Sequence, residues 1–260
     1  MSELLQVRVN PVVMWGFDIP QTEGLFINED GFKGWDSGTP TRRDAVPIPG
    51  GHGQFDVPVV RDAATPAIDG TARAFTAAGL QQLGDLVNAV GADGSRVKLT
   101  VSDRYVTRWA WARLAEVDFI DSGHREGDLY WASFRFLFVL PDPRRYGPVS
   151  NDGPASSIQL TNRGNFPATP VLTVAGSRPG GYTIVGPAGQ QFVVGQALTA
   201  GHPHVIDMED GTLSIDGAVV PGAVTAPRLF TIPAATSGTV SLAGAPAGVT
   251  ISGQIPDTFI

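Results

Sequence analysis

Two of the four histidines in the sequence lie in a pattern that could bind a metal ion. His202 and His204 are two residues apart, so on a β-strand they would share one face, and the carboxylates of Asp207, Glu209 and Asp210 follow closely. The acidic run also resembles a calcium loop, but the alternating ligands and closing glutamate of an EF-hand are missing. We therefore expect a turn that enters a hairpin, and no metal site.

The remaining candidates for catalysis lack partners in the sequence. His52 lies between glycines in GGHGQFD, where a histidine more often hydrogen-bonds the backbone than acts as a base. No nucleophile elbow, phosphate loop, dinucleotide fingerprint or zinc-protease motif occurs. The sequence has 25 carboxylates, so many different pairs could be proposed for a glycosidase, and nothing in the sequence singles one out. We expect no enzymatic activity, no catalytic residue and no cofactor.

Two pairs of residues could contact a ligand. Arg144 and Arg145 could bind an anion, and Trp109 and Trp111 could stack on a sugar or a base. The stronger interpretation is that the arginines bridge two domains and that the tryptophans belong to a core or a subunit interface.

The composition excludes several classes of protein. The chain has 260 residues, 42% of them hydrophobic, no cysteine and a net charge of −7. It is thus typical of a globular protein without disulfides or thiol chemistry, and the charge argues against a non-specific nucleic-acid or anionic-membrane binder. No signal-peptide pattern or apolar window long enough for a membrane span is present, so we expect a protein made in soluble form.

A proline-rich segment, Leu140 to Pro148, divides the chain into parts of different composition. Residues 1–148 hold 15 of the 18 basic residues, 19 of the 25 acidic residues and all five tryptophans. Proline fixes φ and removes amide donors, so we expect that no helix or central strand runs through this linker. The sequence predicts two domains, 1–148 and 149–260, joined by a linker with the residues Pro141, Asp142, Pro143, Arg144, Arg145 and Tyr146.

The first part is expected to be mainly β-structure with one helix. Apolar residues recur at helical spacing in 76–91, with Thr76 as a possible N-cap and Gly91 placed to end the helix. Strands are predicted at 7–17, 24–32, 68–75, 97–101, 105–119 and 130–140, the last covered on both faces. Residues 35–60 form a long extended loop, and such loops are usually functional or interfacial.

The second part shows short strands at regular spacing with Gly, Pro and Asp turns. This pattern is typical of a β-sandwich or jelly roll. The predicted strands are 158–161, 169–175, 182–185, 191–194, 204–208, 212–215, 228–232, 239–242 and 248–253.

Several segments together resemble the distal tail proteins of long-tailed bacteriophages, the siphovirus tail-component family. The similarity is carried by GGHGQFDVPVV at 50–60 with IDGTARA at 68–74, LPDPRRYG at 140–147, GNFPATPVLTVAG at 164–176, VIDMEDGTLSIDGAVV at 205–220 and RLFTIPAATSGTVSLAG at 228–244. The C-terminal GQIPDTFI departs from the aromatic-rich end usual in the family, as does the drawn-out PAATSG turn.

The resemblance implies a mainly β protein: an N-terminal ring-forming β domain with one α-helix, followed by a C-terminal galectin-like β-sandwich. It implies a structural virion protein, a ring at the distal end of the tail tube that joins the tube to the baseplate or tail-tip hub. The implied partners are further copies of the chain in a hexamer, the major tail tube protein, the tail-tip hub or tail-associated protein, and the tape measure protein. DNA would pass through the lumen without specific binding.

Two alternatives remain open at this stage. A carbohydrate-binding adhesion module would present an exposed aromatic platform beside polar side chains, and a cell-wall hydrolase would need a pocket with converging carboxylates. If a ring forms, we expect contacts from the long loop and the two aromatic strands, because one helix is too little to cover their apolar surface. The candidate contact residues are Trp35, His52, Phe55, Tyr105, Trp109, Trp111 and Trp131.

Overall fold

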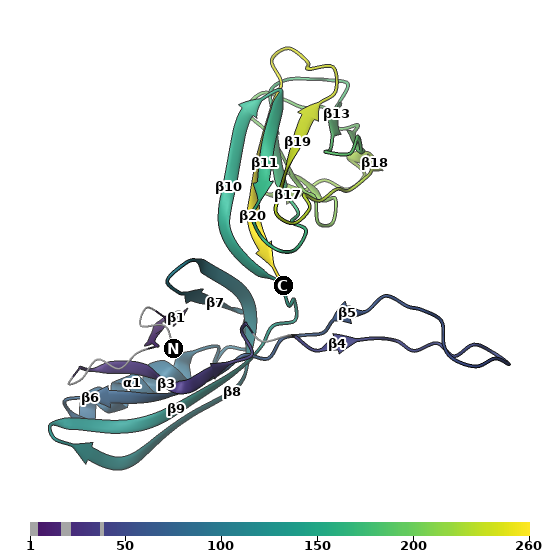
Figure 1. The fold of residues 1–260 in the computed structure, drawn as a ribbon. Helices are drawn as coiled ribbons and strands as arrows, with labels where there is room; N and C mark the ends of the chain where they lie inside the picture. The colour runs from purple at the N-terminus through teal and green to yellow at the C-terminus, as the bar shows by residue number, and fades with distance from the viewer. Residues whose placement is uncertain (1–4, 17–21, 37–38) are drawn as a thin grey trace. The chain divides into compact units, whose positions relative to one another are not determined.

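The structure, a computed structural model, describes residues 5–16, 22–36 and 39–260. The chain divides into two compact units, residues 1–145 and 146–260, each with a hydrophobic core of its own. Strands dominate both units, and the described residues contain one α-helix (Figure 1). The predicted mainly β fold is confirmed.

In the first unit, one sheet closes on itself in the order β8-β7-β1-β2-β3-β6-β9, with β9 pairing back to β8. Neighbours are antiparallel except β2 and β3, which are parallel. The long strand β8 makes the closure possible, because its first part pairs with β7 and the rest pairs with β9. The strands are β1 (Gln6–Val9), β2 (Val12–Trp15), β3 (Gly24–Lys33), β6 (Ala67–Ala74), β7 (Val97–Ser102), β8 (Thr107–Glu126) and β9 (Leu129–Val139).

One strand prediction in this unit is wrong. Residues 7–17 do not form a single strand but the hairpin β1–β2, because the chain turns at Asn10 and Pro11, and proline supplies no amide to continue a ladder. Phe17, the predicted last residue of that strand, lies outside the described residues.

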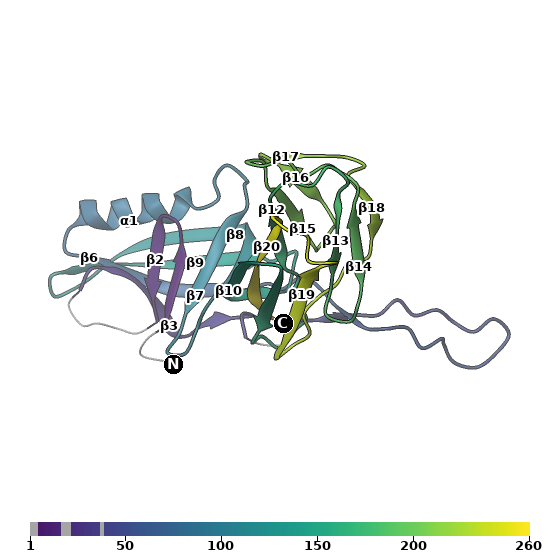
Figure 2. The ribbon, with the colours of Figure 1, turned by 90° about the horizontal axis from the view of Figure 1, so that it is seen from above.

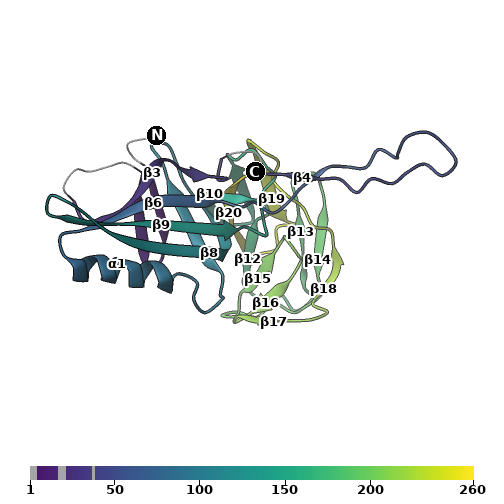
Figure 3. The same ribbon diagram turned by 90° about the horizontal axis from the view of Figure 1, so that it is seen from below.

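The helix α1 (Ala77–Ala89) packs on β6, β8 and β9 (Figures 2 and 3). Thr76 caps it as predicted, since its hydroxyl accepts a hydrogen bond from the amide of Gly79 at 3.0 Å. Leu80 and Val87 enter the core, but Leu86, which the apolar pattern also places in the buried stripe, is 42% exposed. With 13 residues, the helix is too short to span a membrane.

The strand β9 is covered on one face only, so the prediction of cover on both faces is wrong. Phe134, Phe136 and Phe138 are buried on the core side, whereas Ser133 and Arg135 point to the other face and are exposed. The physical reason is that the unit has a single helix, which packs on the core side of the sheet. The outer face of β8 and β9 therefore stays open in the single copy.

The predicted long loop is a two-stranded arm. Apart from positions 37 and 38, which lie outside the described residues, the segment runs out through β4 (Thr41–Arg42) and returns through β5 (Val60–Arg61). A bridge between Pro47 and Gln54 holds the distal part together. Figure 1 shows the arm extending away from the sheet of its own unit.

The second unit is a sandwich of two sheets, as predicted. One sheet has the order β17-β16-β15-β12-β20-β10 within this unit, the other the order β11-β19-β13-β14-β18, and the core lies between them (Figure 1). The strands are β10 (Arg145–Ala155), β11 (Ser157–Asn162), β12 (Val171–Ala175), β13 (Tyr182–Val185), β14 (Gln191–Val194), β15 (His204–Asp207), β16 (Leu213–Ile215), β17 (Ala218–Val219), β18 (Val224–Pro227), β19 (Thr236–Leu242) and β20 (Thr250–Phe259).

Two predictions for the second unit fail. Residues 228–232 make no ladder, only a bridge from Ile232 to Ala168, because Pro227 and Pro233 flank the segment and lack amide donors. The last strand does not stop near Gly253 but continues to Phe259.

The linker prediction also needs correction. The strand β10 begins at Arg145 and contains Pro148, so a strand begins inside the predicted linker, against the expectation from its prolines. Pro141, Asp142, Pro143 and Arg144 remain outside strands, and the Asp142 carboxylate binds the Arg144 side chain at 2.8 Å.

Candidate functional site

The structure separates the two histidines that could have shared a metal ion. His202 contacts the Asp216 carboxylate at 2.6 Å on the surface, whereas His204 is buried at the start of β15. Asp207 accepts a hydrogen bond from the amide of Glu209, as the predicted turn requires. Among the described residues, no three His, Asp or Glu side chains are placed to hold a metal ion.

The buried His204 forms a pair with Tyr182. Its Nδ1 lies 3.0 Å from the Tyr182 hydroxyl, and both side chains are almost fully enclosed. Burial lowers the pKa of His204 and raises the pKa of Tyr182, because the charged form of each would lose its hydration. Both groups are therefore neutral at pH 7, and the pair is a structural link between β13 and β15.

The pair predicts an acid-sensitive second unit. As the pH falls through the ordinary histidine pKa of 6.5, the unfolded chain binds a proton that folded His204, with its lowered pKa, does not bind. The free energy of unfolding should therefore fall on acidification, and calorimetry at pH 7.5 and 5.5 should show a lower melting temperature at the acid pH. His204→Gln should reduce this difference, whereas the surface variant His202→Gln should retain it. An unchanged difference in His204→Gln would contradict the assignment.

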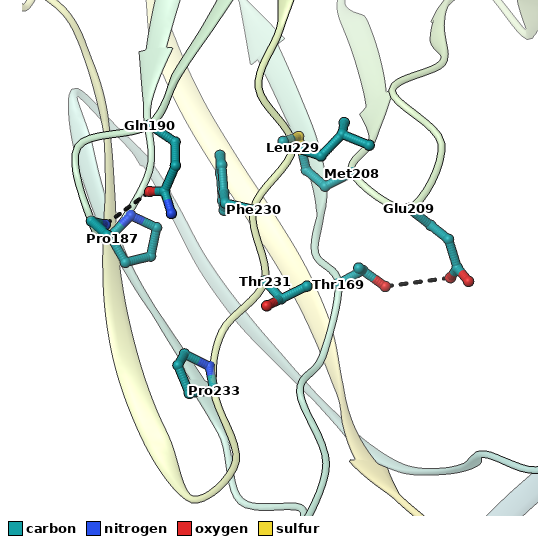
Figure 4. A pocket seen from close by; sticks show the side chains of 10 residues that line it. Thr169, Pro187, Gln190, Met208, Glu209, Leu229, Phe230, Thr231 and Pro233 are labelled. Atoms are coloured by element: carbon teal, nitrogen blue, oxygen red, sulfur yellow. Dashed lines mark hydrogen bonds between the residues drawn. The ribbon is translucent and has the colours of Figure 1, made fainter. Parts of the chain in front are cut away.

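The pocket of about 510 Å³ in the second unit does not have the lining of a catalytic site. Its wall is apolar around Met208, Leu229 and Phe230 (Figure 4), and Glu209 is the only acidic residue that lines it. The Glu209 carboxylate lies 3.4 Å from the Thr169 hydroxyl. A cell-wall hydrolase needs two converging carboxylates, which this pocket does not supply.

Trp35, predicted at a subunit contact, is instead part of the core of the first unit. It is 1% exposed and stacks on Phe32 with ring centroids 6.2 Å apart. The Arg145 guanidinium lies 5.3 Å from the Trp35 ring, and burial lowers the pKa of Arg145. The sequence could not show this, because the buried arginine that covers Trp35 is 110 positions away in the chain.

The tryptophans of β8 lie on the outer face of the closed sheet. The rings of Trp109 and Trp111 meet edge to face at 6.0 Å, and Trp111 is 43% exposed. Lys98 on β7 places its Nζ 4.3 Å from the Trp109 ring, and Arg96 lies 5.7 Å from the Trp111 ring. Cations thus already contact both rings, which makes this surface unlike an open platform for sugars or bases.

The other predicted contact residues are spread over the first unit. Tyr105 is 87% exposed before β8, and Phe55 is half exposed on the arm together with His52. Trp131 on β9 is half-buried between His124 and Arg73. Ile120 is also 60% exposed on β8 but is not among the predicted contact residues. It lies just past residue 119, where the predicted strand ends, and the alternating pattern of β8 continues beyond that point.

Comparisons with known proteins identify the fold. No protein-family model and no curated protein matches the sequence significantly. Among solved structures, the chain matches the SPP1 Dit protein, described as a paradigm of the hub adsorption apparatus in phages that infect Gram-positive bacteria. The match covers 99% of this chain and 100% of that chain, with a TM-score of 0.71 and 14% identity.

Two further matches come from the phage p2 baseplate in its activated conformation, with calcium and with strontium. They have TM-scores of 0.54 and 0.53 at 8% and 9% identity, and cover 96% of this chain and 98% of those chains. Both units therefore take part in the likeness. The chain has the fold of the distal tail proteins of long-tailed bacteriophages, as the resemblance in its sequence predicts.

Proposed function

We propose that this protein is a structural component of a phage tail: a ring at the distal end of the tail tube that joins the tube to the baseplate or tail-tip hub. The observation that carries the proposal is the fold shared with SPP1 Dit over nearly the whole of both chains. The role is assembly rather than catalysis. The protein would be made in the host cytoplasm and reside at the tail tip of the virion.

The first unit offers surface for a head-to-tail contact. Large apolar side chains are exposed on the arm and on β8, among them Phe55, Val59, Trp111 and Ile120. The strand β8 pairs with β7 as far as Ala112 and with β9 beyond it. A head-to-tail contact that closes into a ring would cover the exposed apolar side chains in every copy.

We further propose six copies in the ring, with the tail tube protein on one side and the tail-tip hub protein on the other. The tape measure protein is a further candidate partner. DNA would pass through the lumen without specific binding. We also propose that the predicted domains, 1–148 and 149–260, fold separately, and the division of contacts near residue 145 supports this.

The carbohydrate-binding alternative would need an accessible aromatic ring in the second unit. Its aromatic side chains are buried or half-buried without exception, namely Tyr146, Phe166, Tyr182, Phe192, Phe230 and Phe259. This observation favours the structural role over the adhesion role.

The mass of the purified full-length protein tests the ring. We expect light scattering at tens of micromolar to give a closed oligomer, and negative-stain images to show annular particles. A protein that stays monomeric over this range, also after mixing with tube protein, would overturn the proposal.

A further inference from the structure

One end of the closed sheet of the first unit carries a group of unpaired cations. The strand registers place Arg8 on β1, Thr100 on β7 and Trp109 on β8 in one row, with Lys98 beside Trp111 in the next. Arg96 and Arg113 lie on the same surface, Arg96 over Trp111 and Arg113 bound to the carbonyl of Gly94 at 2.6 Å. We call Arg8, Arg96, Lys98 and Arg113, with Trp109 and Trp111, the cationic patch.

The cations of this patch differ from the other arginines of the unit. Arg108 is ion-paired with Asp36 at 3.1 Å, and Arg135 lies between two carboxylates. Within the described part of the chain, none of the four cations of the patch forms an ion pair with a carboxylate. Four uncompensated positive charges in a protein of net charge −7 indicate a partner with negative charge.

The middle of β8 carries the opposite charge. Asp69 on β6, Arg135 on β9 and Asp118 on β8 form one row across three strands, and Glu116 lies beside them, 3.6 Å from Arg135. Asp69 and Glu116 contact Arg135, Asp118 lies opposite it in the ladder, and Ile120 is exposed two residues further along β8. We call Asp69, Glu116, Asp118 and Ile120, with Arg135, the anionic patch.

No ion pair joins the two patches within the described chain, although Arg113 and Glu116 are only three positions apart on β8. Trp111 and Asp118 are seven positions apart on the same strand, about 23 Å when extended.

We propose that the anionic patch of one copy docks on the cationic patch of the next, with Ile120 packing against Trp111. This inference rests on the proposed ring and names the contact that builds it. Each patch combines a large apolar side chain with charged groups, a composition found in specific interfaces. Because the two patches differ from each other, a contact between them is head-to-tail and can close into a ring.

Paired charge reversals test the docking. Variant A carries Arg8→Glu and Lys98→Glu; variant B carries Glu116→Lys and Asp118→Lys. Each alone would place like charges opposite each other, so we expect both to remain folded but to shift from rings to monomers at 20 µM. Mixed in equal amounts, A and B should recover rings, because every A–B contact is again complementary and an even ring closes with alternating copies.

Two control variants change the same charges elsewhere. Asp85→Lys lies on the exposed side of α1, and Arg228→Glu lies in the second unit; both should assemble like the wild type.

Wild-type protein that forms no ring would contradict the proposed function itself. Wild-type rings that persist in A and in B, or A and B that fail to recover rings on mixing, would overturn the docking alone. If the wild-type protein binds DNA and A, with intact rings, does not, the cationic patch would be assigned to nucleic acid, and the docking would be overturned.

Discussion

Asn162→Ala is expected to lower the free energy of unfolding of the second unit by about 3–5 kcal/mol. Asn162 is fully buried at the end of β11, and its amide group joins three segments that are distant in sequence. Its Nδ2 donates to the carbonyls of Phe166 at 2.8 Å and of Ile232 and Pro233 at 3.2 Å, and its Oδ1 accepts from the amides of Gly164 at 2.9 Å and Thr258 at 3.2 Å.

The cost is large because alanine removes the side-chain partner of the Phe166 carbonyl and of the Gly164 and Thr258 amides. The carbonyls of Ile232 and Pro233 keep the Ala168 amide and the Thr236 hydroxyl. An unsatisfied buried group costs about 1–3 kcal/mol. Chemical denaturation of the full-length protein, followed by a probe in the second unit, should show the loss. Asn165→Ala is the matched control: its amide also hydrogen-bonds the backbone, at Ile260, but at an exposed position, and we expect about 1 kcal/mol or less. Equal effects of the two substitutions would contradict the role of Asn162.

Gly70→Ala should destabilise the first unit by about 3 kcal/mol or more. Gly70 lies in β6, and a Cβ atom there would be 2.2 Å from Cζ of Phe134 and 2.5 Å from the carbonyl oxygen of Phe26. The Phe134 ring is packed against Phe136 in the core, with centroids 5.8 Å apart, so it has little freedom to move. The carbonyl belongs to the paired strand β3, so relief would require β3 and β6 to separate.

Thermal unfolding of the first unit measures this effect. Gly123→Ala, near the turn of the β8–β9 hairpin, is the control, because no atom lies within 4 Å of the added Cβ and only the φ of +67° is unfavourable. We expect this control to cost about 1–2 kcal/mol. A Gly70→Ala protein as stable as the control would show that the sheet accommodates the side chain, against our expectation.

The sequence by itself determined those features that depend on near neighbours in the chain. The helix could be predicted with its cap because the Thr76 hydroxyl reaches an amide three residues away. The short strands 182–185 and 191–194 of the second unit follow from alternation between turn residues, and the structure reproduces their limits. The likeness to phage distal tail proteins rests on the same local signals, because its motifs consist mainly of turns in a fixed order.

Only the tertiary structure decided which surfaces are buried and which are open. Trp35 and Trp111 are both tryptophans, but Arg145 from a distant segment lies over Trp35, which is buried, whereas Trp111 stays 43% exposed. The prolines predict a boundary near residue 145, where the two units divide, but they do not predict that β10 begins there at Arg145. The two charged patches of the first unit also depend on long-range pairing. The net charge of residues 1–148 is −4, which says nothing of where the charges lie. Strand register brings Arg8, Lys98 and Arg113 together in one patch and Asp69 and Asp118 in the other. Strand register and sheet closure depend on contacts between segments that are distant in sequence, so no short stretch of the chain determines them.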